Sequence, residues 1–147
     1  MKQWLPFNSE GDLPPGVHSA TLEQVCRHFG ASPHRAIIAE RLTRIYRLAQ
    51  ASGHLARFII FGSFITAKSE PRDVDIFLLM EDSFDVRNAS NEARLVFDHA
   101  VAQNSLGASV FWIRRVAALG GEEATISYWQ IKRDGGRRGI VEVISHD

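Results

Sequence analysis

The fold of this chain depends on the stretch FIIFGSFITAKSEPRDVDIFLL, residues 58–79. In it, an apolar run ends at Gly62-Ser63, a polar loop follows, and a second apolar run opens with Asp73 and Asp75. These two carboxylates are two residues apart, so in a strand they project from the same face, about 7 Å apart at Cα. Like charges in an apolar setting repel each other and lose hydration. The pair therefore predicts that bound divalent cations compensate both charges.

The Gly62-Ser63 pair predicts a phosphate site. An apolar, β-branched run at 57–61 reads as a buried strand, which places the pair at its C-terminal end, where α/β sheets tend to bind ligands. Glycine lets a phosphate approach the backbone, and a serine hydroxyl with backbone N–H groups can hold an anion. Mg²⁺ favours carboxylates together with phosphate oxygens, and two such ions can clamp a phosphoryl displacement. We therefore expect a triphosphate at Gly62-Ser63 whose metals lie on Asp73 and Asp75.

The same residues resemble a known signature. Gly62-Ser63 followed by Asp73-Val74-Asp75-Ile76 is similar to the motif of the DNA polymerase β-type nucleotidyltransferase superfamily, in particular its small single-domain members, the minimal nucleotidyltransferases. The resemblance covers residues 57–80, with a compatible order of elements as far as 113. It implies that a nucleoside monophosphate is transferred from a nucleoside triphosphate to a protein or nucleic-acid acceptor with two Mg²⁺ ions. Asp73 and Asp75 would be the catalytic metal ligands, and Gly62 and Ser63 would bind the nucleotide.

A third carboxylate, which active members of that superfamily carry on a later strand, is not evident. The next expected strand, 109–113, contains no acid, which leaves Glu142 and Asp98 as candidates. If neither completes the site, the resemblance implies a catalytically degenerate module that binds a partner. Minimal members are often found beside a toxin in bacterial toxin–antitoxin pairs, so a toxin-like protein is the implied partner. An unrelated small α/β domain with structural acids is the further alternative.

Basic residues near the motif have two interpretations each. Lys68, in the loop between the two halves of the motif, either binds the nucleotide by neutralising triphosphate charge or is a solvated loop residue. Arg133, Arg137 and Arg138 surround an Asp-Gly-Gly turn and either contact phosphate or nucleic acid or form a solubilising hairpin tip.

Hydrophobic periodicity predicts an α/β (α+β) fold, in which a small mixed sheet is flanked by helices and preceded by a helical pair. The prolines and glycine near the start predict an extended arm over residues 1–18, followed by a single domain over 19–147. The segment 121–133 fits neither helix nor hairpin period cleanly, so both remain open. The other expected elements are helices at 22–29, 33–52 and 91–101, and strands at 57–61, 74–80, 109–113 and 140–144.

Composition excludes several classes of protein. The net charge of the 147 residues is zero, so nothing in it draws the whole chain to nucleic acid or to an acidic membrane surface. No apolar run is long enough to span a bilayer, and one cysteine excludes disulfide frameworks and Cys-x-x-Cys metal sites. We therefore expect a cytoplasmic protein with no membrane partner. None of the histidines shows metal-ligand spacing, so we expect structural or surface roles for all six: His18, His28, His34, His54, His99 and His146.

Overall fold

The computed structural model describes residues 2–145 of the chain. The expectation for His146, and the last two positions of the predicted domain 19–147, lie outside the described residues. Within residues 2–145, no helix combines the length and the apolar character needed to cross a bilayer.

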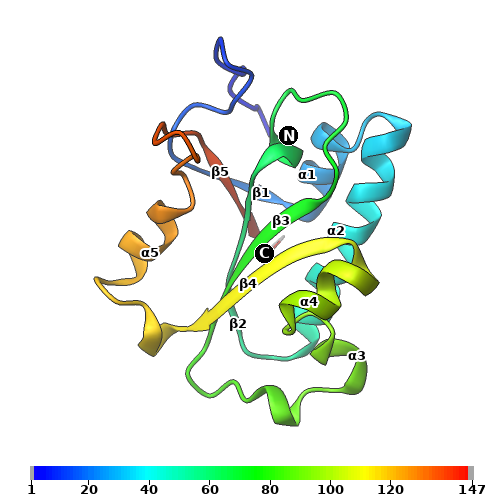
Figure 1. Ribbon diagram of the computed structural model, residues 1–147, viewed down its shortest axis with the longest axis vertical. Coiled ribbons are helices and arrows are strands. Elements are labelled where there is room, and N and C mark those ends of the chain that lie inside the picture. Colours follow the sequence, from blue (N-terminus) through cyan, green and yellow to red (C-terminus); the bar gives the residue numbers. More distant parts are fainter. Residues whose placement is uncertain (1, 146–147) are drawn as a thin grey trace.

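A five-stranded mixed sheet forms the centre of the fold (Figure 1). Its spatial order is β1-β5-β2-β3-β4, so the last strand in the sequence lies inside the sheet. β2 runs antiparallel to both of its neighbours, while β1 is parallel to β5 and β4 is parallel to β3. The strands are β1 (Val17–Thr21), β2 (Leu55–Phe61), β3 (Val74–Met80), β4 (Ala108–Arg114) and β5 (Ile140–Ile144).

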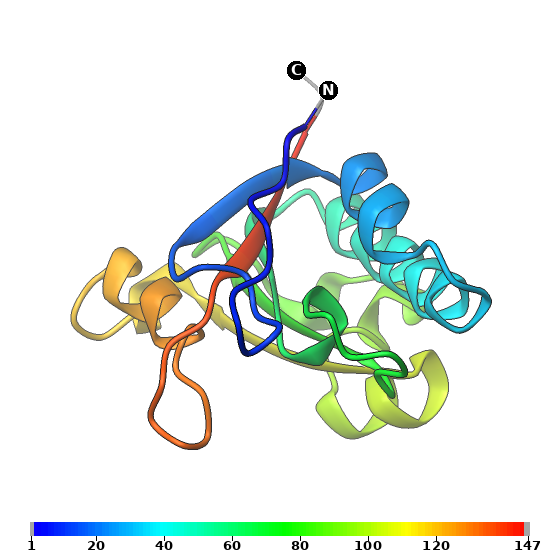
Figure 2. The same cartoon turned by 90° about the horizontal axis from the view of Figure 1, so that it is seen from above.

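Two helices with strong start signals cover one face of the sheet. α1 (Leu22–Phe29) begins with the expected capping box, in which Thr21 and Gln24 satisfy each other's backbone N–H groups. α2 (Pro33–Ala51) begins at Ser32, whose hydroxyl accepts from the N–H of Arg35. Figure 2 shows these two helices on one side of the sheet and α5 (Glu122–Tyr128) on the other. The expected α/β class with helices flanking a mixed sheet is thus confirmed.

The period-2 alternation of the strands separates two cores. The larger core joins one face of the sheet, with side chains such as Phe58, Ile76 and Val141, to the buried stripe of α2. The smaller core lies under α5 on the opposite face and includes Ile59, Phe77 and Ile126. The expected carboxylates of β3 belong to this second, less covered face.

The structure differs from the sequence predictions at both ends of the chain. β1 begins at Val17, inside the extended arm predicted over residues 1–18, because Val17 pairs with Ile140, more than 120 residues away. The segment 121–133 is neither a helix alone nor a hairpin arm alone. It forms α5 as far as Tyr128, and a tight turn with a bridge between Ile131 and Arg137 then follows.

The prediction of a single helix over 91–101 is also wrong, because the helix is interrupted before Asp98. Ser90 caps α3 as expected, but α3 spans only Asn91–Arg94. Asp98 then takes an extended conformation and its carboxylate accepts from the N–H of Val101, which starts α4 (His99–Val101). A further turn over Ala102–Leu106 continues to Gly107.

Candidate functional site

Gly62 lies directly against the carboxylate of Asp75. In the β2–β3 pairing Phe61 is opposite Asp75, so the next residue along β2 reaches the start of β3. Gly62 has φ 83° and ψ −163°, a conformation that is essentially restricted to glycine. A Cβ at this position would overlap Oδ2 of Asp75 and lie 3.0 Å from its Cγ. The structure therefore brings together the two halves of the motif, and Ser63 follows in a short 3-10 turn.

Asp73, Asp75 and Ser109 form a polar cluster at the start of β3 and β4. Ser109 is the β4 partner of Asp75, and its hydroxyl donates to Oδ2 of Asp73 at 3.4 Å. Burial raises the pKa of Asp75 to about 6, and the negative charge of Asp73 acts in the same direction. The Ser109 hydroxyl, Arg138 and Arg133 oppose this rise. Negative charge at this site is thus only partly compensated, which is the electrostatic condition that favours a cation.

Glu142 and Asp98, the two candidates for a third carboxylate, both have structural partners. Glu142 pairs with Ile59 in the sheet, so it is separated from β3 by β2, and its carboxylate accepts from Arg57 at 2.9 and 2.7 Å. Asp98 is exposed and caps α4. The residue beside Asp75 on β4 is a serine. Across residues 2–145 there is no cluster of three or more acidic, histidine or cysteine side chains placed to hold a metal ion.

The loop after Gly62 is held by the first turn of α2, a contact that the sequence does not indicate. The guanidinium of Arg35 donates to the carbonyls of Phe64 at 2.6 Å, Thr66 at 2.7 Å and also Lys68. The ring of His34 is 2.6 Å from the carbonyl oxygen of Pro71. Two adjacent side chains of α2 thereby fix both ends of the loop. The sequence signal was only a basic pair after a helix-starting proline, which has no specific meaning by itself.

We expect Arg35→Lys to loosen this loop. An ammonium is a compact donor that cannot span several carbonyls as the planar guanidinium does. Hydrogen bonds to charged groups each contribute about 1.5–3 kcal/mol, so the loss of one or more should lower the free energy of unfolding by about 1–3 kcal/mol. Urea unfolding measures the change, and hydrogen exchange should show faster exchange of the amides at 64–68. Arg47→Lys, at an exposed position of α2, is the matched control. Unchanged exchange in the loop would contradict this role for Arg35.

Lys68 has a defined backbone and an exposed side chain. Its N–H donates to Thr66 Oγ1 at 3.2 Å, and its carbonyl accepts from Arg35. The expected contact of its ammonium with nucleotide stays a prediction.

Three segments gather at the end of the sheet where the loop lies, at the top of Figure 1. The N-terminal arm joins the loop through the hydrogen bond from the N–H of Ala67 to the carbonyl of Gly11. The arm also joins the turn after α5, because Asp12 is 3.0 Å from Lys132 and 3.5 Å from Arg138. Two of the arginines near the Asp-Gly-Gly turn, Arg138 and Arg133, oppose the rise in the pKa of Asp75 through their positive charge. The expected contact of these arginines with phosphate stays a prediction.

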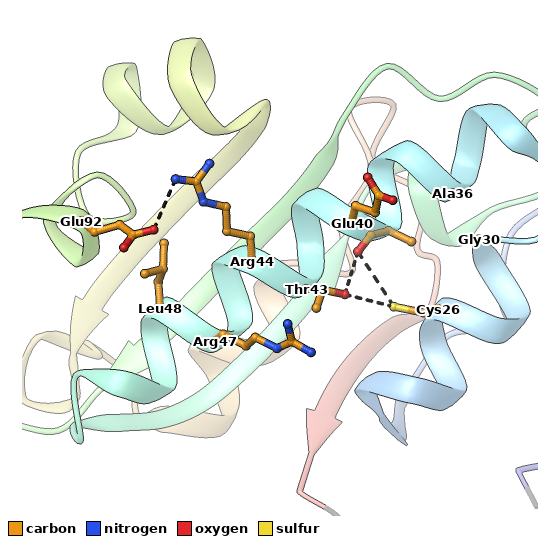
Figure 3. Close-up of a pocket in the computed structure, with 10 residues that line it drawn as sticks. Cys26, Gly30, Ala36, Glu40, Thr43, Arg44, Arg47, Leu48 and Glu92 are labelled. Atoms are coloured by element: carbon orange, nitrogen blue, oxygen red, sulfur yellow. Dashed lines mark hydrogen bonds and ion pairs between the residues drawn. The ribbon is translucent and has the colours of Figure 1, made fainter.

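A separate cavity of about 610 Å³ lies on the side of the molecule formed by α1 and α2 (Figure 3). Cys26 and Thr43 are hydrogen bonded at 3.5 Å on its wall, and Arg44 pairs with Glu92 at 3.3 Å. The polar groups of these four side chains are thus already paired with one another, Cys26 with Thr43 and Arg44 with Glu92. The cavity is lined by α1, α2 and Glu92, which cover the sheet face opposite Asp75.

Comparison with protein families gives one match, over residues 5–144, to a family described as a family of unknown function (DUF6932). The match covers nearly the whole chain, which therefore belongs to this family. Neither the curated proteins nor the solved structures give a match.

Proposed function

We propose that this DUF6932 member binds a nucleoside triphosphate with Mg²⁺ and transfers its nucleoside monophosphate to a protein or nucleic-acid acceptor. Asp73 and Asp75 would hold the metal, and the Gly62-Ser63 turn would hold the phosphates. The single observation that carries the proposal is the packing of Gly62 against the Asp75 carboxylate. This contact supports the proposal because a metal–phosphate site needs a phosphate-holding turn beside carboxylates, and the charge of this carboxylate pair is only partly compensated.

In this proposal the chain itself positions and polarises the substrate. The loop carbonyls are already bonded to Arg35, so the turn after Gly62 is fixed before ligand arrives. Arg133 and Arg138 add positive charge on the side of the turn after α5. Preorganised charges of this kind supply most of the catalysis in phosphoryl and nucleotidyl transfer, where the metal ions neutralise the developing negative charge.

One observation favours a second candidate, a nucleotide-binding module with little or no transferase activity that acts through a partner. Ser109 stands beside Asp75 where an acid would extend the cluster, and Glu142 is engaged by Arg57. A missing general base typically costs about 10²- to 10⁴-fold in rate. The partner proposed for this second candidate is a toxin-like protein.

Thermal unfolding with Mg²⁺ and each of the four nucleoside triphosphates tests the shared binding step. At a ligand concentration 100-fold above Kd, the stabilisation is about 2.7 kcal/mol, or roughly 5–10 °C for a domain of this size. We expect this shift with at least one nucleotide and its loss in Asp73→Asn. Glu40→Gln, an exposed carboxylate on α2, should keep it. If no nucleotide stabilises the wild-type protein, the binding proposal is wrong.

Release of pyrophosphate, together with transfer of an α-labelled nucleotide, separates the two candidates. Label that appears on an acceptor, and that depends on Asp73, supports the transferase. Nucleotide-dependent stabilisation without pyrophosphate release supports the binding module instead.

A further inference from the structure

An aromatic surface begins next to the carboxylate pair on the same face of the sheet. Phe61 is opposite Asp75 on β2, and Phe111 is two residues after Ser109 on β4. Trp129, just beyond α5, joins them, since its ring lies 4.5 Å from Phe61 and 5.4 Å from Phe111. The rings of Phe61 and Phe111 are 6.2 Å apart. The three rings therefore form one continuous surface beside the carboxylates.

Phe111 is the accessible part of this surface. It is 40% exposed, whereas Phe77, the neighbouring ring on β3, is only 2% exposed beneath Trp129. A single exposed ring carries no functional meaning, but Phe111 is continuous with the half-buried rings of Phe61 and Trp129, and a contiguous apolar patch beside a polar cluster is typical of a ligand site. His99 extends the surface around the edge of the sheet, because its ring is 4.7 Å from Phe111 and is fixed by a hydrogen bond with the Val110 carbonyl at 3.0 Å.

The order of the strands puts Phe111 on the strand next to the carboxylate pair. Gly62-Ser63 is at the end of β2, the carboxylates are on β3, and Phe111 is on β4, the edge strand in Figure 1. Adjacent strands are about 4.8 Å apart. A triphosphate held at the turn after β2, with its metals on the carboxylates of β3, would therefore have Phe111 within reach on the next strand.

We propose that Phe111, supported by Phe61 and Trp129, is the stacking surface for the base of the nucleoside triphosphate bound at the carboxylate pair. This inference rests on the proposed function and adds the part of the site that recognises the nucleoside. Stacking of a base on an aromatic side chain contributes about 1–3 kcal/mol, whichever base it is. The surface should therefore favour nucleotides over bare phosphates by roughly 5- to 150-fold.

Isothermal titration with Mg²⁺-tripolyphosphate and with each of the four Mg²⁺-nucleoside triphosphates tests this inference. The best nucleotide should bind the wild-type protein at least fivefold more tightly than tripolyphosphate. Phe111→Leu keeps an apolar side chain on the strand but removes the ring, so it should abolish most of this difference and leave tripolyphosphate affinity unchanged. Phe111→Trp should preserve the difference. Phe7→Leu is the control, because it removes a ring of similar exposure, 36%, that packs near α1 on the other side of the sheet.

The possible failures are distinguishable. If nucleotides and tripolyphosphate bind the wild-type protein equally, or if Phe111→Leu binds nucleotide as tightly as the wild-type protein, the stacking surface is refuted while the phosphate site stands. If neither tripolyphosphate nor any nucleotide binds, the proposed function fails and this inference fails with it.

Discussion

Gly62→Ala is expected to lower the free energy of unfolding by about 2–4 kcal/mol and to abolish nucleotide-dependent stabilisation. The backbone of Gly62, at φ 83° and ψ −163°, costs an alanine about 1–3 kcal/mol before any contact is considered. The new Cβ would also overlap Oδ2 of Asp75, so the carboxylate must move away from the loop. Urea unfolding measures the first effect, and thermal unfolding with Mg²⁺ and nucleotide measures the second.

A matched glycine separates the two causes. Gly53 also has a positive φ, 75°, but a Cβ there would meet nothing within 4 Å. Gly53→Ala should therefore cost only the backbone term, about 1–2 kcal/mol, and leave ligand binding intact. Removal of the carboxylate should relieve the clash, so Gly62→Ala should cost less in an Asp75→Ala background than in the wild-type protein. Strict additivity of the two substitutions would contradict the proposed contact.

Asp75→Asn is expected to stabilise the protein at neutral pH when no divalent cation is present. The pKa of Asp75 is raised from its ordinary value of 3.8 to about 6 in the folded state, so the folded protein resists ionisation of this carboxyl. One pKa unit corresponds to 1.36 kcal/mol, which sets the cost at about 3 kcal/mol or less above pH 6. An amide carries no charge and removes this cost. Urea unfolding at pH 7.5 in the presence of EDTA measures the gain.

The pH dependence of this gain has a definite sign. Between pH 3.8 and about 6 the folded state binds more protons at Asp75 than the unfolded state, so its contribution to stability falls as the pH rises. The advantage of Asp75→Asn should thus be small near pH 4 and complete above about pH 7. The stability of Glu40→Gln relative to the wild-type protein should not change in this way between pH 4 and pH 7. An advantage that is equal at both pH values would indicate a cause other than ionisation.

Mg²⁺ and nucleotide should reverse this difference in stability, so that the wild-type protein becomes more stable than Asp75→Asn. A bound cation favours the ionised carboxylate, so the wild-type protein gains stability from the ligand while Asp75→Asn gains little. The same reasoning predicts that apparent Mg²⁺ affinity falls as the pH drops below about 6. A residue that destabilises the free protein and stabilises the complex is characteristic of a functional site. Equal ligand-induced shifts in both proteins would argue that Asp75 is not a metal ligand.

The local elements of this fold could be predicted because their signals are local. Thr21 and Gln24 form a capping box within one helical turn, and the apolar stripe of α2 repeats at the helical period. The two carboxylates fall on one face of β3 because a strand alternates every residue. The approach of Gly62 to Asp75 was likewise suggested by the sequence, since the single loop 62–73 joins two consecutive strands that then pair as neighbours.

Only the tertiary structure decided which strands are neighbours and which side chains support the site. Periodicity indicates which face of an element is buried, but not what covers it. Nothing in the sequence therefore showed that β5 enters between β1 and β2, so that Arg57 of β2 engages Glu142. The same limit hid Arg35, whose loop partners are about 30 residues away. Local sequence determined the carboxylate pair and its facing glycine, while long-range pairing placed Ser109 beside Asp75, because sheet order depends on the packing of the whole chain.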